Sequence, residues 1–350
     1  MKDKIINEIV TLSIDLMNCK TIKGEYLEFE NAHKIIKKYL KETNYLIKEI
    51  EINNYKNLII SNTTSTDLDI IYCGHLDVVE NDTYKGIVKN NKLYGRGSFD
   101  MKGQDAVMLS LLKNNITNKK IALILTSDEE IGGFCCKKIL KDYKAKLAII
   151  PDAGNNFELI TEEKGLLQLE IKVKGKKYHA SEPFKGNNAI IKAMNIYNKL
   201  ISIYQQPTKS TEYKTSICLS KIQGGETINA VCESCTMTLD IRNIKENTIK
   251  EILNNIKKID KNANINILDQ GPVFSTDINN MYIKEFINKA KNIVKIKQSF
   301  CNATSDAIYF SEKKIPCILI NPKGNYWHSK KEYVEIESLY TLYELFKTTL

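Results

Sequence analysis

The chain is poor in arginine, histidine and tryptophan, and each shortage is informative. Its 350 residues include four histidines and one tryptophan, and lysine and arginine together number 51. Only Arg96 and Arg242 are arginines. A chain that uses lysine almost throughout keeps arginine chiefly where the planar guanidinium matters. The two arginines and the few histidines are therefore candidates for a functional site.

Long apolar runs are also absent. No run approaches the roughly 18 residues that span a bilayer. The first 20 residues mix acidic, basic and apolar side chains at helical spacing, so we expect an amphipathic helix rather than a secretory signal. The nine cysteines are scattered, which favours a reduced, cytoplasmic protein. Cys232 and Cys235 form one CxxC pair, but no second pair accompanies it, which argues against a structural zinc site.

The net charge of +9 comes from lysines spread along the whole chain. A nucleic-acid-binding surface would instead cluster lysine, arginine and aromatic residues on one element. We therefore expect no nucleic-acid partner and no membrane association.

The pattern of apolar runs predicts two structural classes in one chain. Between residues 57 and 165, short apolar runs alternate with helical stretches, as in a mostly parallel sheet with helices on both faces. The segment 166–274 instead reads β-α-β-β-α-β, with strands that are polar on one side. We therefore predict an α/β domain (1–165 plus 275–350) interrupted by an inserted α+β domain that acts as a lid or dimerisation domain.

Acidic side chains and histidines fall at the ends of the apolar runs. Four such runs, DIIYCGHLDVV, IALILTSDEE, KLAIIPDAG and CILINPKGNYWH, each end in at least one, and LYGRGSFDMKG adds a fifth acid. The residues concerned are His75, Asp77, Asp100, Glu129, Glu130, Asp152 and His328. Because ligands in open α/β sheets bind beyond the carboxyl ends of the strands, these residues predict a metal centre with hydrolytic chemistry.

Two of these groups have alternative interpretations. His75 and Asp77, two residues apart, suit a metal-bound imidazole held by a carboxylate, but also a capping Asp beside a core histidine. Glu129 and Glu130 suit a ligand next to a proton shuttle, but also acids at a helix N-terminus. For Asp128 we keep the interpretation as an acid at a helix N-terminus and assign no other role.

The remaining candidates are more ambiguous. His33 lies in a polar helical stretch and is expected at the surface, whereas His179 lies in a turn or strand-end context. Arg242 suits bidentate binding of a substrate carboxylate, or a structural ion pair with Asp240. GRGSFDMKG is not a phosphate loop, because Asp100 stands where bare N–H groups would be needed. No GxSxG motif occurs, so a serine hydrolase is disfavoured.

These motifs, in this order, resemble the dinuclear zinc hydrolases that include succinyl-diaminopimelate desuccinylase, acetylornithine deacetylase, aminoacylase and carboxypeptidase G. The matching segments are GHLDVV, LYGRGSFDMKG, TSDEEIGG, PDAG, KGKKYHAS, GGETINAV, LDIR, TSDA and WHS. They extend from about residue 72 to 328, so the resemblance covers most of the chain.

The resemblance implies a role for each matching residue. His75 and Asp152 would hold one zinc, Glu130 and His328 the other, and Asp100 would bridge both. Asp77 would orient His75, and Glu129 would be the general acid/base. His179 would stabilise the developing oxyanion, often across a dimer, while Asn229 and Arg242 would bind substrate.

The implied activity is hydrolysis of the amide bond of an N-acyl amino acid, of deacetylase or desuccinylase type, or of a short peptide. A metal-bridging hydroxide would attack, with Glu129 moving the proton. Cobalt or manganese would fit the ligands as zinc does, and a homodimer is expected. Asp152 stands where deacylases more often have Glu, while Glu80 and Cys232 replace prolines common in the family. Three alternatives therefore stay open: a di- or aminopeptidase, a non-catalytic metal-binding homologue, and presentation of the substrate by an acidic carrier protein.

Overall fold

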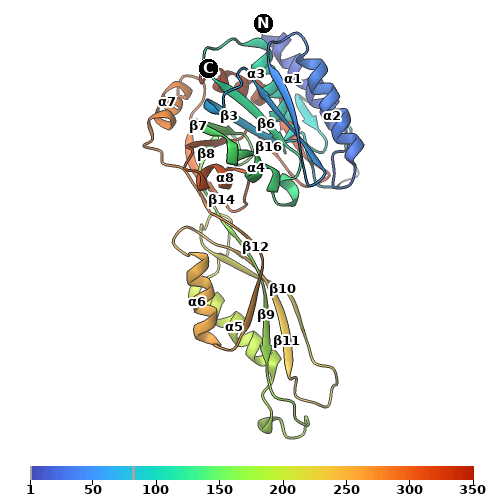
Figure 1. The fold of residues 1–350 in the computed structure, drawn as a ribbon, viewed down its shortest axis with the longest axis vertical. Coiled ribbons are helices and arrows are strands. Elements are labelled where there is room, and N and C mark those ends of the chain that lie inside the picture. Colours follow the sequence, from blue (N-terminus) through green and yellow to red (C-terminus); the bar gives the residue numbers. More distant parts are fainter. Residues whose placement is uncertain (1, 81–82) are drawn as a thin grey trace. The chain divides into compact units, whose positions relative to one another are not determined.

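The fold is taken from a computed structural model that describes residues 2–80 and 83–350. The chain divides into two compact units (Figure 1). The first comprises residues 1–162, 275–301 and 305–350, and the second comprises residues 163–274 and 302–304. None of the helices in the described residues is both long and apolar enough to cross a membrane.

The first unit is built on a nine-stranded sheet with the order β1-β2-β6-β3-β7-β15-β8-β13, in which β14 also pairs with β8. These strands are β1 (Leu46–Ile52), β2 (Tyr55–Ser61), β3 (Asp67–His75), β6 (Ile121–Thr126), β7 (Lys144–Ile150), β8 (Glu158–Glu163), β13 (Phe274–Ser275), β14 (Lys297–Cys301) and β15 (Cys317–Ile320). The four central strands β6, β3, β7 and β15 are parallel, whereas β1, β2 and β8 pair antiparallel. Strand β6, IALILT, is buried along its whole length, as expected for a parallel strand covered on both faces.

Helices cover both faces of this sheet. They are α1 (Lys2–Met17), α2 (Tyr26–Tyr39), α3 (Lys102–Asn114), α4 (Phe134–Ile139), α7 (Met281–Ala290), α8 (Ala307–Glu312) and α9 (Ile336–Lys347). Helices α1, α3 and α9 join one apolar core with Ile70 and Tyr72 of β3. The next side chain along, Cys73, points to the opposite face and lies near α4 and the start of α8. This arrangement confirms the predicted mostly parallel α/β class, with antiparallel strands added at the edges.

A small four-stranded sheet in the same unit has the order β16-β17-β5-β4. Its strands are β4 (Ile87–Lys89), β5 (Lys92–Tyr94), β16 (Gly324–Asn325) and β17 (Tyr333–Glu335). In its register Tyr94 lies opposite Tyr333 and Leu93 opposite Val334. This sheet therefore joins the segment that precedes Asp100 to the segments on both sides of His328.

A buried lysine ties α1 to the start of α3. Lys102 donates hydrogen bonds from Nζ to the carbonyl oxygens of Leu16 (3.0 Å) and Cys19 (2.8 Å), at the C-terminal end of α1. Helix carbonyls at this end have no partner within the helix, and a cation complements the local dipole. Burial nevertheless lowers the pKa of Lys102 to about 8.

The second unit is an antiparallel sheet with the order β10-β11-β9-β12 and two helices. Its elements are β9 (Leu166–Lys174), α5 (Ala189–Tyr204), β10 (Ser216–Gly224), β11 (Ser234–Arg242), α6 (Ile249–Ile259) and β12 (Asn264–Gly271). Strand β9 alternates buried and less buried side chains, so one sheet face packs on the helices. Thr248 caps α6 by accepting a hydrogen bond from the N–H of Glu251 at 3.2 Å. The predicted β-α-β-β-α-β order is confirmed.

The prediction that His33 lies at the surface is wrong. Its side chain is buried, and Nδ1 lies 2.8 Å from the Glu49 Oε1. On α2, His33 falls on the same stripe as Phe29 and Ile36, which packs into the molecule. The polar neighbours in the sequence lie on the other side of the helix.

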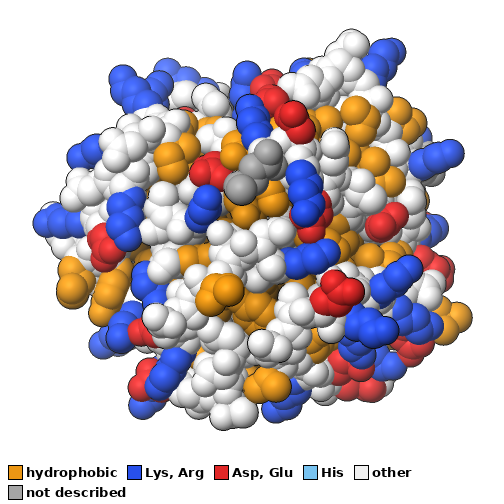
Figure 2. Space-filling model, turned by 90° about the horizontal axis from the view of Figure 1, so that it is seen from above, with side chains coloured by type: hydrophobic (Ala, Val, Ile, Leu, Met, Phe, Trp, Pro, Cys, Tyr) orange, Lys and Arg blue, Asp and Glu red, His pale blue; other side chains and the backbone are white. Residues whose placement is uncertain are grey.

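Charged residues are spread over the molecular surface seen in Figure 2. Lysine and arginine side chains lie around this whole face, with acidic side chains between them.

Candidate metal centre

Four neighbouring parallel strands end at one edge of the large sheet, and each leads into predicted site residues. Strand β3 ends at His75, β6 at Thr126 shortly before Glu129, β7 shortly before Asp152, and β15 leads into the segment with His328. Because adjacent parallel strands place their carboxyl ends together, residues far apart in sequence meet here.

Asp100 lies between the two histidines. Its Oδ1 is 3.2 Å from the His75 Nε2, and its Oδ2 is 3.0 Å from the His328 Nε2. Asp152 Oδ1 lies 3.6 Å from the same His75 nitrogen. Glu130 Oε2 lies 3.1 Å from the His328 nitrogen. The five predicted ligands therefore form two groups that share one carboxylate.

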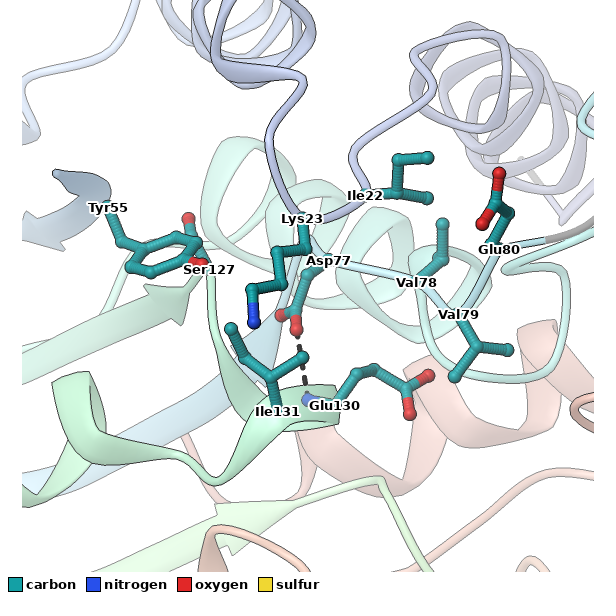
Figure 3. A pocket seen from close by; sticks show the side chains of 10 residues that line it. All are labelled: Ile22, Lys23, Tyr55, Asp77, Val78, Val79, Glu80, Ser127, Glu130 and Ile131. Atoms are coloured by element: carbon teal, nitrogen blue, oxygen red, sulfur yellow. Dashed lines mark hydrogen bonds between the residues drawn. The ribbon is translucent and has the colours of Figure 1, made fainter.

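Asp77 holds both His75 and the loop of Glu130. The His75 Nδ1 lies 3.0 Å from the backbone oxygen of Asp77 and 3.5 Å from its carboxylate Oδ1. The other carboxylate oxygen accepts a hydrogen bond from the Glu130 N–H at 2.9 Å (Figure 3). With Nδ1 engaged in this way, Nε2 of His75 is left facing the acidic groups.

The donor set fits a pair of divalent cations. The nitrogen–oxygen separations of 3.0–3.6 Å bracket the edge of about 3.3 Å of a tetrahedron with metal–ligand bonds of about 2.0–2.1 Å. Buried Nε2 of His75 and buried Oε1 of Glu130 have no hydrogen-bond partner. Imidazoles and carboxylates together suit zinc, cobalt or manganese.

The acidic groups of the site raise the pKa values of its two histidines. Burial opposes a charged His75, but the nearby carboxylates of Asp100, Asp152 and Asp77 outweigh it and raise its pKa well above the ordinary value. Hydrogen bonds with Asp100 and Glu130 raise the pKa of His328 to about 10. Both shifts reflect the negative charge of the surrounding carboxylates, which bound cations would also compensate.

Burial favours the neutral acid form of three of the carboxyl groups, whereas the two histidines lower the pKa of Asp100. Burial raises the pKa of Asp152 to about 6 and also raises that of Glu130. The pKa of Glu129 is raised well above its ordinary value, first by burial and then by the nearby Asp152 carboxylate. A carboxyl whose pKa is shifted towards neutrality is suited to general acid/base chemistry.

Glu129 and Glu130 lie in a single 3₁₀ turn, Glu129–Ile131, between β6 and α4. A Glu129 carboxylate oxygen lies within 4.8 Å of ligand atoms of both His75 and Asp152. Asp128 instead accepts hydrogen bonds from the N–H of Cys135 at 3.0 and 3.2 Å, near the start of α4. The role of an acid at a helix N-terminus, which the sequence suggested for Asp128, is confirmed.

Three predicted site residues belong to the second unit. His179 is exposed, and its Nδ1 lies 2.7 Å from the Ser181 Oγ. The N–H of Ala180 donates to the backbone oxygen of Asn229 at 2.9 Å, so His179 and Asn229 come from paired segments. Arg242 at the end of β11 donates from Nε to the Asp240 Oδ1 at 2.8 Å, which is the ion pair considered as the alternative.

A cavity of about 220 Å³ opens beside Asp77 and Glu130 (Figure 3). Ile22, Val78 and Ile131 contribute apolar wall, and the ammonium group of Lys23 extends towards Asp77. Pockets for drug-sized ligands usually measure about 300–1,000 Å³, so this cavity suits only a small group.

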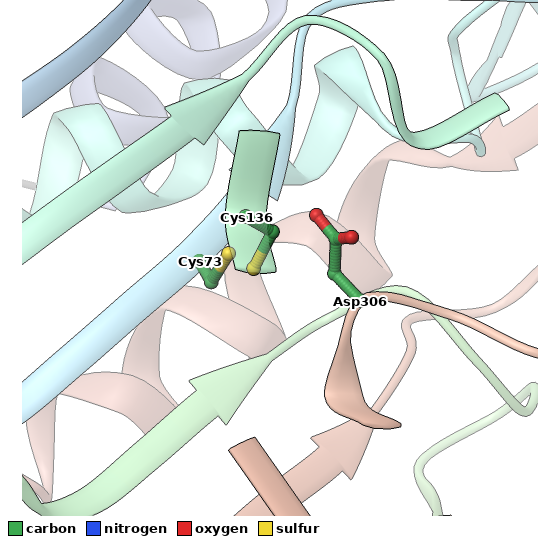
Figure 4. A group of neighbouring side chains, drawn as sticks. All are labelled: Cys73, Cys136 and Asp306. Atoms are coloured by element: carbon green, nitrogen blue, oxygen red, sulfur yellow. The ribbon is translucent and has the colours of Figure 1, made fainter. Parts of the chain in front are cut away.

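A second cluster, which the sequence did not single out, is formed by residues of β3, of α4 and of the start of α8. Cys73, Cys136 and Asp306 are buried, and their sulfur and carboxylate atoms lie within 4.8 Å of one another (Figure 4). Asp306 accepts a hydrogen bond from the Thr126 Oγ1 at 3.1 Å. A Cβ on Gly133 would lie 2.4 Å from the Asp306 carboxylate, so only glycine fits there. Asp306 lies in the TSDA segment, which was the signal that could have found it.

Comparisons with known proteins identify the family of the chain. The model of peptidase family M20/M25/M40 matches residues 71–350. An acetylornithine deacetylase from Buchnera aphidicola subsp. Acyrthosiphon pisum (strain Tuc7) is 28% identical over 340 residues, covering 87% of this chain and 86% of that protein. A succinyl-diaminopimelate desuccinylase from Blochmanniella floridana is 27% identical over 380 residues, covering 98% of each.

The fold is also similar to that of solved structures. Aminopeptidase PepT from Bacillus cereus ATCC 10987 superimposes with a TM-score of 0.78 at 20% identity, covering 98% of this chain and 97% of that one. Because the family model matches most of the chain, the chain belongs to peptidase family M20/M25/M40, a family of metal-dependent hydrolases, as the resemblance of its motifs indicated.

Proposed function

We propose that this enzyme uses two divalent cations to cleave the amide bond of an N-acyl amino acid or a short peptide. The observation that carries the proposal is Asp100, whose two oxygens lie 3.2 and 3.0 Å from the nitrogens of His75 and His328. One carboxylate between two histidine groups is the arrangement that a bridged metal pair requires.

The residues that would hold the ions are His75 and Asp152 on one side, Glu130 and His328 on the other, and Asp100 between them. Bound ions, which we propose to be zinc, would polarise the scissile carbonyl and make water a better nucleophile at neutral pH.

Glu129 is the proposed general acid/base. Its carboxylate is close to His75 and Asp152, and its raised pKa suits uptake of a proton from the attacking water. The same proton can then pass to the nitrogen of the leaving amine. Asp77 keeps His75 in the orientation that leaves Nε2 free for the centre.

The second unit supplies the proposed substrate contacts. His179 would stabilise the developing oxyanion, and Asn229 and Arg242 would bind the substrate, with the guanidinium on a carboxylate. A homodimer through this unit is supported by its exposed apolar side chains, such as Phe184 (78% exposed) and Ile228 (104% exposed). Nine free cysteines support a reducing, cytoplasmic setting.

The proposal is tested with a substrate panel and one substitution. The purified protein, with and without added zinc, cobalt or manganese, is assayed on acetylornithine, succinyl-diaminopimelate and a set of di- and tripeptides. Glu129→Gln is expected to lower kcat about 10²–10⁴-fold while two metals per chain remain bound. Loss of a metal from this variant would make Glu129 a ligand instead.

A matched control is Glu312→Gln, at an exposed glutamate of α8. Its activity should equal that of the wild type. If a wild-type sample with two metals per chain cleaved no member of the panel, the non-catalytic interpretation would replace this proposal.

Cleavage of peptides rather than acyl amino acids is the second candidate function. It is favoured by Asp152, where deacylases of this family more often have glutamate. Faster turnover of dipeptides than of both acyl substrates in the same panel would select it.

A further inference from the structure

Arg96, one of the two arginines, is buried in an ion pair. Its side chain is 1% exposed, and its Nη1 donates to the Glu332 Oε2 at 2.5 Å. Glu332 is equally buried, at 1% exposure. An ion pair removed from water in this way gains stability only when further hydrogen bonds satisfy the charges, so the other contacts of Glu332 are informative.

The second carboxylate oxygen of Glu332 binds the backbone of the bridging residue. Oε1 accepts hydrogen bonds from the N–H of Phe99 at 3.0 Å and from the N–H of Asp100 at 3.2 Å. Glu332 lies four residues after His328, in the same loop between β16 and β17. One carboxylate thus connects the loop that carries His328 to the loop that carries Asp100.

Aromatic packing holds the same two loops together. The ring of Phe99 stacks on that of Trp327, with centroids 5.6 Å apart and an angle of 22° between the planes. A Cβ on Gly324 would come within 2.3 Å of the Phe99 ring. The neighbours of Asp100 and His328 in sequence are therefore in direct contact, so a shift of either loop moves both metal-ligand candidates.

We propose that Glu332 and Arg96 are positioning residues of the metal centre: Glu332 fixes the Asp100 backbone relative to His328, and Arg96 compensates the buried carboxylate. The inference rests on the proposed function only in taking Asp100 and His328 as metal ligands. Loss of a purely structural ion pair would change only stability, whereas loss of these positioning residues should also change metal binding.

The test is direct metal titration of the metal-free protein with zinc, and with cobalt to record the visible spectrum of the bound ion. Glu332→Ala is expected to weaken metal binding about 10–100-fold, the usual cost of removing a group that orients a ligand. The cobalt spectrum should change, and kcat should fall with little change in KM. Glu332→Gln, which keeps an acceptor for the two N–H groups, should retain more of the affinity.

Glu8→Ala is the matched control. Glu8 accepts from the Tyr39 hydroxyl at 2.5 Å and pairs with Lys113 at 3.3 Å, so its loss also removes a partly buried ion pair of the same unit. This variant should lose stability but bind zinc as the wild type does.

The inference is overturned if Glu332→Ala is folded by circular dichroism, melts like Glu8→Ala, and binds zinc and cobalt as the wild type does. Should Glu332→Ala not fold, Glu332→Asp replaces it, because the shorter side chain cannot reach both the Arg96 guanidinium and the two N–H groups, and unchanged affinity and spectrum in this variant would be equally decisive. A wild type that binds no metal would defeat both proposals, whereas a wild type that binds two metals but cleaves nothing leaves this one standing.

Discussion

The two units of the chain place their candidate functional residues in different surroundings. In the first, charged and titratable side chains such as His75, Asp105 and Glu332 are buried, and many have strongly shifted pKa values. In the second, His179 and Asn229 are exposed, and Arg242 is only partly covered. Burial of charge costs free energy unless it is compensated, so the first unit is the one in which bound cations would compensate buried charge. The three candidate residues of the second unit are instead at least partly exposed to water.

The largest effect is expected from Asp100→Ala. Because this carboxylate lies between both histidine groups, its loss should remove both metals and lower kcat/KM at least about 10³-fold, as a metal contributes several kcal/mol to the transition state. Metal content and activity are measured on the same sample. Retention of two tightly bound metals would contradict the bridging role.

A smaller effect is expected from Arg242→Lys in the second unit. If the guanidinium binds a substrate carboxylate, KM should rise about 10–100-fold with kcat nearly unchanged, because a charged hydrogen bond contributes about 1.5–3 kcal/mol. If its only role is the ion pair with Asp240, KM should stay constant and the melting temperature should change little. Steady-state kinetics together with thermal unfolding separate the two roles.

Metal binding should strengthen as the pH rises. His328, with a pKa of about 10, and His75, whose pKa is also raised, must each release a proton before a metal can bind. Between pH 7 and 9 zinc affinity should therefore increase by up to about tenfold per pH unit for each proton displaced. Calorimetric titration in two buffers of different ionisation enthalpy counts the protons.

The stability of the metal-free protein should show the opposite trend. A folded-state histidine pKa above the unfolded value means that the native state binds the extra proton, so its stabilisation is complete below about pH 6.5. It is lost as the pH rises towards 10 at His328. Urea unfolding of the metal-free protein should thus give lower free energies at pH 9 than at pH 6. An increase over this range would contradict the ion pairs described here.

The smallest effect is expected from Cys136→Ala in the Cys73–Cys136–Asp306 cluster. Burial raises the pKa of the Cys136 thiol well above its ordinary value, so the thiolate that a metal needs is disfavoured. Metal content should stay at two per chain. A loss of one bound metal would show that the cluster takes part in metal binding.

The sequence pattern predicted the strands of the large sheet and the candidate ligands at their ends. Buried strands such as IALILT, and acids and histidines at strand ends, indicated both the sheet and the residues at its edge. It could not predict which side chains far apart in the sequence would form ion pairs. Arg96 was recognised as unusual, but its partner Glu332 is 236 residues away, and nothing in the local pattern connects them. The prediction that His33 is exposed was wrong for a related reason. Its burial depends on which face of the helix packs against the molecule, and the polar residues beside it in the sequence did not indicate that face.

The contact between Lys102 and the end of α1 has a practical consequence for shortened versions of the chain. Removing residues 2–19 would take away both carbonyl acceptors and leave an ammonium group stranded in the interior, two positions from Asp100. An N-terminal deletion, although remote in sequence from the proposed metal ligands, should therefore lower the free energy of unfolding of the enzyme.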